Sequence, residues 1–263
     1  MKTMRFHREI NLFALAVSFF TRLPVPGGLD FSQSHLNRAS RYFTLVGWLV
    51  GILVAGVFWL MMEAGLPITV ALVLSMVASL MITGAFHEDG LADTADGLGG
   101  GWTPEQKLSI MKDSRLGTYG AAALWCALFL KYVLLLELAE VGRGALVITG
   151  LLMAHPLSRA VSTLMISALP YVTQAAHSKV KPLAESQTRA DLMISMVVAS
   201  SALLLLPGVS PLMVLALFLT GWGMKTLMQR QIGGFTGDTL GATQQVAELV
   251  VYLVILLGQG GNA

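Results

Sequence analysis

Residues 43–62 read FTLVGWLVGILVAGVFWLMM and contain no charged side chain. A helix needs about 20 mostly apolar residues to cross the hydrocarbon layer of a bilayer. Because lipid offers the backbone no hydrogen-bond partners, a spanning segment of this kind is expected to be helical. The stretch therefore predicts a membrane-spanning helix.

Comparable apolar stretches recur through the rest of the chain. Of its 263 residues, 55% are hydrophobic and 12% are charged, against about 25% charged residues in an ordinary soluble domain. The mean hydropathy is +0.70. We expect an all-α polytopic membrane protein, one domain over 1–263, whose helix bundle has about seven spans: 43–62, 67–86, 118–138, 145–169, 192–206, 212–228 and 245–258.

The composition also limits the classes of partner. The single cysteine, Cys126, lies inside an apolar stretch, so we expect neither a disulfide framework nor a cysteine-based zinc site. The expected partner is the lipid bilayer, and no nucleic-acid partner is expected. The oligomeric state stays open, because nothing in the pattern favours a monomer over an oligomer.

The N-terminal segment, 1–42, is predicted to lie at the membrane surface. Cations at Lys2, Arg5 and Arg8 precede an apolar run, 10–20, but no small-residue cleavage site follows it. As a helix the run is only about 16 Å long, too short to span. We therefore expect an interfacial helix and not a signal peptide.

The placement of cations predicts the orientation. With the N-terminus inside, 14 of the 17 Lys and Arg residues fall in inner segments, and only Arg143 falls in an outer loop. Such an excess marks the cytoplasmic side of a membrane protein. The inner segments are also the long ones: 87–117, 170–191 and 229–244.

An acidic motif begins where the predicted second span ends. Residues 87–97 read HEDGLADTADG, with carboxylates at Glu88, Asp89, Asp93 and Asp96. On a helix, the last three share one face, where like charges repel one another. A hard divalent cation would neutralise them. Mg²⁺ commonly takes one or two carboxylates together with substrate phosphates, and a metal pair suits displacement at phosphorus.

The segment 87–117 is interpreted as an acidic catalytic loop. Its glycines at 97 and 99–101 are expected to end the helix, and a short capped helix is expected to begin near residue 103. Lys112 and Arg115 are candidates for holding phosphate oxygens, although ordinary cytoplasmic charge explains them as well. Asp113 is a candidate metal ligand or general base.

Two further groups of cationic residues are candidates for the site. His155 and Arg159 lie one turn apart in the predicted fourth span, where an ionisable residue suggests a function. Arg159 is expected to neutralise the carboxylates or an anionic substrate. Lys179 and Lys181 are candidates for contacting phosphate, with solvated loop charge as the alternative.

A glycine-rich loop, 229–244, precedes the last predicted span. It contains GGFTGDTLGA at 233–242. Such a loop can present backbone N–H groups to phosphate and a carboxylate to a metal or a hydroxyl group. Gly234, Thr236 and Gly237 are the candidate phosphate contacts, and Asp238 is the candidate carboxylate.

The motifs at 20–26, 87–101, 113–117 and 234–242 together resemble the cobalamin synthase (adenosylcobinamide-GDP ribazoletransferase) family, in order and at matching spacing. The resemblance implies a Mg²⁺-dependent transferase in the bacterial inner membrane. It would join adenosylcobinamide-GDP to α-ribazole or α-ribazole 5′-phosphate and release GMP. It also implies metal ligands at Asp89, Asp93 and Asp96 with Glu88, stabilisation of GMP by Arg115, Arg159 and Lys181, and a general base at Asp113 or Asp238.

Two other classes remain as alternatives. Residues 93–97 match the opening Asp-x-x-Asp-Gly of CDP-alcohol phosphotransferases, but Leu98, Gly99 and Gly100 follow where that family has Ala-Arg. A cation transporter would also use intramembrane carboxylates. Against it, the carboxylates lie beside the membrane rather than near its middle, and no inverted repeat is evident.

Overall fold

The computed structural model describes residues 2–142, 144–172 and 184–260, and within these ranges its regular elements are all helical. A lone β-bridge joins Tyr171 to Phe235. The elements are α1 (Lys2–Phe20), α2 (Gln33–Ala39), η1 (Ser40–Tyr42), α3 (Phe43–Glu63), α4 (Ile68–Thr83), α5 (Phe86–Gly100), α6 (Pro104–Met111), α7 (Thr118–Gly142), α8 (Ala145–Ala168), α9 (Arg189–Ser200), η2 (Ser201–Leu205), η3 (Pro207–Val209), α10 (Ser210–Ile232) and α11 (Gly237–Gly260).

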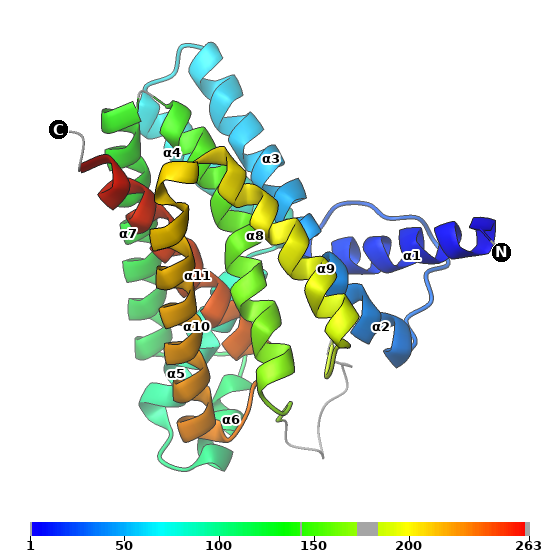
Figure 1. Ribbon diagram of the computed structural model, residues 1–263. Helices are drawn as coiled ribbons and strands as arrows, with labels where there is room; N and C mark the ends of the chain where they lie inside the picture. Colours follow the sequence, from blue (N-terminus) through cyan, green and yellow to red (C-terminus); the bar gives the residue numbers. More distant parts are fainter. Residues whose placement is uncertain (1, 143, 173–183, 261–263) are drawn as a thin grey trace.

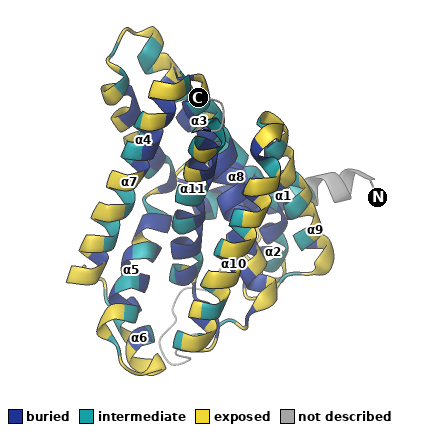
Figure 2. Ribbon diagram, turned by 60° about the vertical axis from the view of Figure 1, so that its left-hand side comes forward, coloured by how far each residue is buried: buried dark blue, intermediate teal, exposed yellow. Residues whose placement is uncertain are grey.

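The long helices form an elongated bundle with α8 and α11 at its centre. Helices α7, α10 and α11 run along the bundle, whereas α1 lies across it (Figure 1). Figure 2 shows buried residues on α8 and exposed residues on the outer faces of α7 and α10. Those exposed faces carry large apolar side chains, including Phe129, Phe218 and Trp222. An apolar exterior of this extent is what a lipid-facing surface requires.

The structure confirms the all-α polytopic class, but the number of spans differs from the prediction. Five helical stretches of the described chain are long and apolar enough to cross a membrane, or six if the bent pair α4 and α5 forms one span. The predicted span 192–206 is not among them. Its α-helix, α9, has 12 residues and then tightens into the 3-10 helix η2.

The predicted second span is broken. Helices α4 and α5 meet at an angle of 85°, and the residues between them, Gly84 and Ala85, have φ of 66° and 55°. This left-handed conformation is open to glycine and costly for alanine. The Arg22 side chain lies against Gly84, and the Arg22 N–H donates to the carbonyl of Ile82 at 2.7 Å. The chain before α2 therefore braces this elbow.

The segment 87–117 contains the two helices predicted for it, α5 and α6, and the glycines at 100 and 101 lie where α5 ends. The glycine at 97 does not end α5, which continues to Gly100. A β-carbon on Gly97 would lie 2.9 Å from the backbone oxygen of Lys107. The glycine instead lets α6 pack directly against α5. The predicted capping box at Thr103 and Gln106 is present at the start of α6.

Candidate active site

Helices α5 and α11 cross with their backbones in contact. A β-carbon on Gly90 would lie 2.8 Å from the Asp238 carbonyl oxygen, and one on Gly241 would lie 3.1 Å from the carbonyl oxygen of His87. Real β-carbons rarely come this close to backbone atoms, so the crossing requires both glycines. It brings the acidic motif and the glycine-rich loop, about 150 residues apart, to one place.

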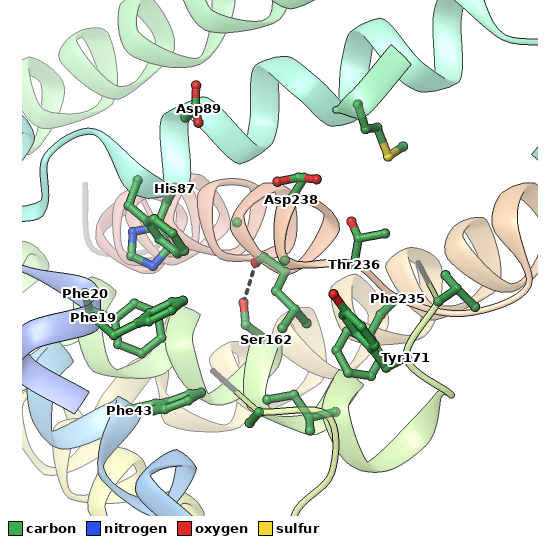
Figure 3. Close-up of a pocket in the computed structure, with 18 of the residues that line it drawn as sticks. Phe19, Phe20, Phe43, His87, Asp89, Ser162, Tyr171, Phe235, Thr236 and Asp238 are labelled. Atoms are coloured by element: carbon green, nitrogen blue, oxygen red, sulfur yellow. Dashed lines mark hydrogen bonds between the residues drawn. The ribbon is translucent and has the colours of Figure 1, made fainter. Parts of the chain in front are cut away.

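A cavity of about 260 Å³, here called the aromatic cavity, opens beside this crossing. Figure 3 shows aromatic side chains on two sides of it and Asp238 between them. The lining residues that matter below are Phe19, Phe20, Phe43, Phe86, His87, Asp89, Lys112, Arg159, Tyr171, Phe235, Thr236, Gly237 and Asp238.

A second cavity of about 690 Å³, here called the polar cleft, is also lined by residues of α5. Its lining includes Arg22, Glu88, Asp89, Asp93 and Ser114. Among the described residues that line either cavity, three line both, namely Phe19, Phe86 and Asp89. Asp89 is therefore the carboxylate that stands between the two compartments.

The carboxylates of α5 do not all serve one site. Asp93 interacts electrostatically with Asp89, Asp96 and Asp238, so these groups are near one another. Asp96, however, accepts hydrogen bonds from the N–H groups of Gly117 at 2.7 Å and Gly120 at 2.8 Å. It thereby satisfies free amides at the start of α7. The predicted shared face is present, but Asp96 is committed to holding α7.

Glu88 faces the bundle interior. Its Oε1 accepts a hydrogen bond from Gln245 Nε2 at 3.1 Å, its Oε2 has no partner among the described residues, and the side chain is buried. In the described part of the chain, no three His, Cys, Asp or Glu side chains gather closely enough to form a metal cage. The four predicted ligands are thus not brought together as one set.

Arg159 and His155 are both buried in α8. Arg159 lines the aromatic cavity, and its Nη1 donates to the backbone oxygen of His155 at 3.0 Å. Among the described residues, Arg159 forms no ion pair. A buried guanidinium without a carboxylate partner is expected to attract an anionic ligand.

Of the candidate residues that follow α6, one lines a cavity and two do not. Lys112 lines the aromatic cavity and interacts attractively with Asp238. Asp113 and Arg115 line neither cavity; they pair with each other at 2.5 Å, and the Arg115 side chain is 87% exposed. Hydrogen bonding from Arg115 holds the pKa of the Asp113 carboxyl below its usual value, which makes that carboxylate a weaker base.

The glycine-rich loop is ordered by its own contacts. Thr236 and Thr239 cap the start of α11 reciprocally, with N–H to Oγ1 distances of 2.9 and 3.2 Å. Thr236 and Gly237 line the aromatic cavity. Gly234 does not; it lies against Pro170, whose carbonyl accepts the Phe235 N–H at 2.9 Å. Lys179 and Lys181 lie outside the described residues.

Sequence reasoning did not predict a buried ion pair beside the site. Lys131 of α7 and Glu248 of α11 are 2.5 Å apart, and both side chains are almost fully buried. Glu248 also accepts hydrogen bonds from Tyr252 at 2.9 Å and Gln244 at 2.8 Å. The available signal was the presence of opposite charges in two different spans.

The aromatic lining was also missed. Phe19 and Phe20 end α1, Phe43 begins α3 and Phe86 begins α5, so they meet only in the folded chain. Arg22, which borders the polar cleft, was recognised as a cytoplasmic charge and as part of the 20–26 motif, but it was given no role in the site. Phenylalanines at the ends of apolar stretches give no sequence signal that separates a binding cavity from ordinary packing.

Comparisons with known proteins agree on one family. Residues 12–256 match the family model described as Cobalamin-5-phosphate synthase. The adenosylcobinamide-GDP ribazoletransferase of Shewanella frigidimarina is 51% identical over 253 residues, covering 95% of each chain. That of Shewanella amazonensis is 52% identical over 254 residues, covering 96% of this chain and 97% of the relative. No solved structure matches.

Proposed function

Because the chain belongs to the cobalamin-5-phosphate synthase family, we propose that the two cavities beside α5 join adenosylcobinamide-GDP to α-ribazole or its 5′-phosphate. The ribose hydroxyl oxygen attacks the cobinamide-side phosphorus. The bond from that phosphorus to the bridging oxygen breaks, and GMP leaves. The products are GMP and adenosylcobalamin or its 5′-phosphate. The family assignment favours this reaction over phospholipid synthesis and cation transport.

The position of Asp89 indicates where in the structure this reaction takes place. A transfer between two large substrates needs a place where both reach one set of charged groups. Asp89 lines the aromatic cavity and the polar cleft alike. Asp93 interacts electrostatically with Asp89 and Asp238, so carboxylates lie close to the boundary between the compartments.

The carboxylates also fit Mg²⁺ held jointly with a substrate. Asp89, Asp93 and Asp238 repel one another, and their oxygens are the donors that Mg²⁺ prefers. The absence of a three-residue cage among the described residues suits an ion that takes one or two carboxylates and completes its shell with phosphate and water. When bound, Mg²⁺ would neutralise charge on the diphosphate. Asp89 and Asp93 are the residues that we propose hold it; both oxygens of Asp96 are bonded to Gly117 and Gly120, and Glu88 is buried against Gln245.

The chain's own groups account for the remaining steps. Arg159 and Lys112 lie at the aromatic cavity and supply positive charge for phosphate oxygens. Asp238 lies in the same cavity and accepts the proton of the attacking hydroxyl; Asp113 lines neither cavity and is paired with Arg115. Because phosphoryl transfer needs little covalent help from the protein, positioning and charge neutralisation carry the catalysis.

We propose that this site faces the cytoplasm of a bacterial inner membrane, with the N-terminus on the same side. The support is the 14-to-1 distribution of cations between predicted inner and outer segments. Labelling of single cysteines introduced at Lys112 and Glu63 would test it. In intact cells, an impermeant thiol reagent should modify the residue at 63 and spare the one at 112, after replacement of Cys126 by serine.

A GMP-release assay tests the function directly. The purified protein in detergent should release GMP only when adenosylcobinamide-GDP, α-ribazole and Mg²⁺ are all present. Excess chelator should abolish release, and added Mg²⁺ should restore it. Full activity in chelator would exclude the metal, whereas no GMP from the complete mixture would exclude the reaction itself.

A further inference from the structure

The aromatic cavity is enclosed by rings that contact one another in two groups. On one side, Phe20 meets Phe43 with ring centroids 4.6 Å apart and stacks on His87 at 5.6 Å with an interplanar angle of 7°. On the other side, Tyr171 meets Phe235 at 5.5 Å. Figure 3 shows the labelled rings of both groups around one space. Two apolar walls suit a flat aromatic ligand.

Two carboxylates of the cavity lie to one side of these rings. In Figure 3, Asp89 lies on α5 and Asp238 at the start of α11, both apart from Phe43 and from Tyr171. A ligand that combined an apolar ring with a polar sugar would place the ring between the walls and the sugar beside the carboxylates. Of the two substrates, α-ribazole has this form, because it is a dimethylbenzimidazole base on a ribose.

We infer that the aromatic cavity binds the benzimidazole base of α-ribazole, which directs the ribose hydroxyl towards Asp238 and Asp89. The inference rests on the proposed function and adds which substrate each compartment takes. Adenosylcobinamide-GDP then occupies the polar cleft, where Arg22 contacts its diphosphate. The reacting hydroxyl and phosphorus approach each other at Asp89, which both compartments share.

The chemistry of the other base argues against a reversed arrangement. Guanine carries hydrogen-bonding groups around most of its edge, and burying them without partners is costly. Benzimidazole has a largely apolar edge. The cavity volume of about 260 Å³, just below the range of drug-sized ligand pockets, about 300–1,000 Å³, limits the occupant to a small group. The volume therefore suits a bicyclic base, and the largely apolar edge of benzimidazole favours that base over guanine.

Two ring-removing variants and one charge-removing variant test the inference. Tyr171→Leu and Phe43→Leu each change a residue that lines only the aromatic cavity. Each should raise the KM for α-ribazole roughly five- to hundredfold, the range for losing one base–aromatic stack, and leave the KM for adenosylcobinamide-GDP unchanged. Arg22→Gln should raise the KM for adenosylcobinamide-GDP and leave the KM for α-ribazole unchanged; an unchanged thermal unfolding temperature shows that the elbow at Gly84, against which Arg22 packs, is intact. Phe218→Leu, on the exposed face of α10, is the matched control and should change neither.

Equilibrium dialysis of α-ribazole against the purified protein gives a readout without turnover. Wild type should bind it, and free dimethylbenzimidazole should compete; both ring variants should weaken binding by the same factor as the KM. If the wild-type protein bound α-ribazole but released no GMP, the proposed reaction would be excluded, whereas the inference that the aromatic cavity binds the base would remain. Unchanged α-ribazole affinity in correctly folded Tyr171→Leu, or a loss confined to adenosylcobinamide-GDP, would overturn the inference. Phe43 is buried, so its replacement risks misfolding. The variant of the half-buried Tyr171 is therefore the decisive test of the inference.

Discussion

Gly90 of α5 rests directly on the backbone of Asp238 in α11, with no space between them for a side chain. This contact sets the separation between the acidic motif and the glycine-rich loop. It also fixes the position of Asp238 relative to Asp89, one residue before Gly90. Catalysis that depends on positioning is sensitive to shifts of about 1 Å.

Replacement of Gly90 by alanine should therefore force the two helices apart. We expect turnover to fall at least about 100-fold and the free energy of unfolding to drop by about 1–3 kcal/mol, the usual cost of overpacking. GMP release and thermal unfolding in detergent measure the two effects. Gly56→Ala is the control, because nothing lies within 4 Å of a β-carbon there. Equal effects at both positions would show that the crossing has no special role.

Asp89→Asn should abolish turnover without unfolding the protein. The side chain is exposed, so its loss costs little stability, but it is the carboxylate common to both cavities. We expect kcat to fall at least about 100-fold, as when a group that stabilises transition-state charge is removed. Asp113→Asn makes the same chemical change outside both cavities and should keep nearly full activity. A more damaging effect at Asp113 than at Asp89 would reverse the assignment of the site.

Asp93 and Asp96 should separate into a metal-binding role and a structural role. Asp93→Asn should raise the Mg²⁺ concentration needed for half-maximal GMP release about tenfold or more, because one carboxylate ligand is lost. Asp96→Asn should leave that concentration unchanged. It should instead lower stability by about 1–3 kcal/mol, because the amide nitrogen that replaces one oxygen cannot accept the second N–H and leaves it without a partner. Magnesium titrations and thermal unfolding of both variants check this, and a raised Mg²⁺ requirement in Asp96→Asn would contradict it.

Removing one partner of the buried pair Lys131 and Glu248 should lower the free energy of unfolding more than replacing both partners. Lys131→Met leaves a buried carboxylate without its cation and should cost about 3–5 kcal/mol. Adding Glu248→Gln should recover much of that loss, since glutamine can still hydrogen-bond Tyr252 and Gln244. Thermal unfolding of the two single variants and the double variant forms the complete cycle. A double variant as unstable as the sum of the singles would show that the two residues are not coupled.

Much of the architecture was predictable because apolar length and charge placement are properties of the sequence itself. The helical class follows from stretches such as 43–62, and the shared face of Asp89 and Asp93 follows from helical spacing. The capping box at Thr103 was predictable for the same reason. In each case a local rule is enough.

The rest depends on contacts between distant segments. Nothing near Asp96 in the sequence shows that the N–H groups of Gly117 and Gly120 will donate hydrogen bonds to its carboxylate. Continuous hydrophobicity through 67–86 conceals a bend whose cause is the backbone conformation at Gly84 and Ala85. The aromatic cavity likewise exists only once α1, α3 and α5 have met.

The elbow between α4 and α5 gives the N-terminal segment a part in assembling the enzyme. A chain that turns aside within a membrane protein exposes main-chain polar groups that lipid cannot satisfy. Arg22 donates its amide to Ile82 and covers Gly84 with its side chain. Removal of the first 22 residues would therefore do more than weaken binding to the membrane surface. It would also remove the contacts that hold the bend between α4 and α5, and with them the fixed orientation of the helix that carries the acidic motif.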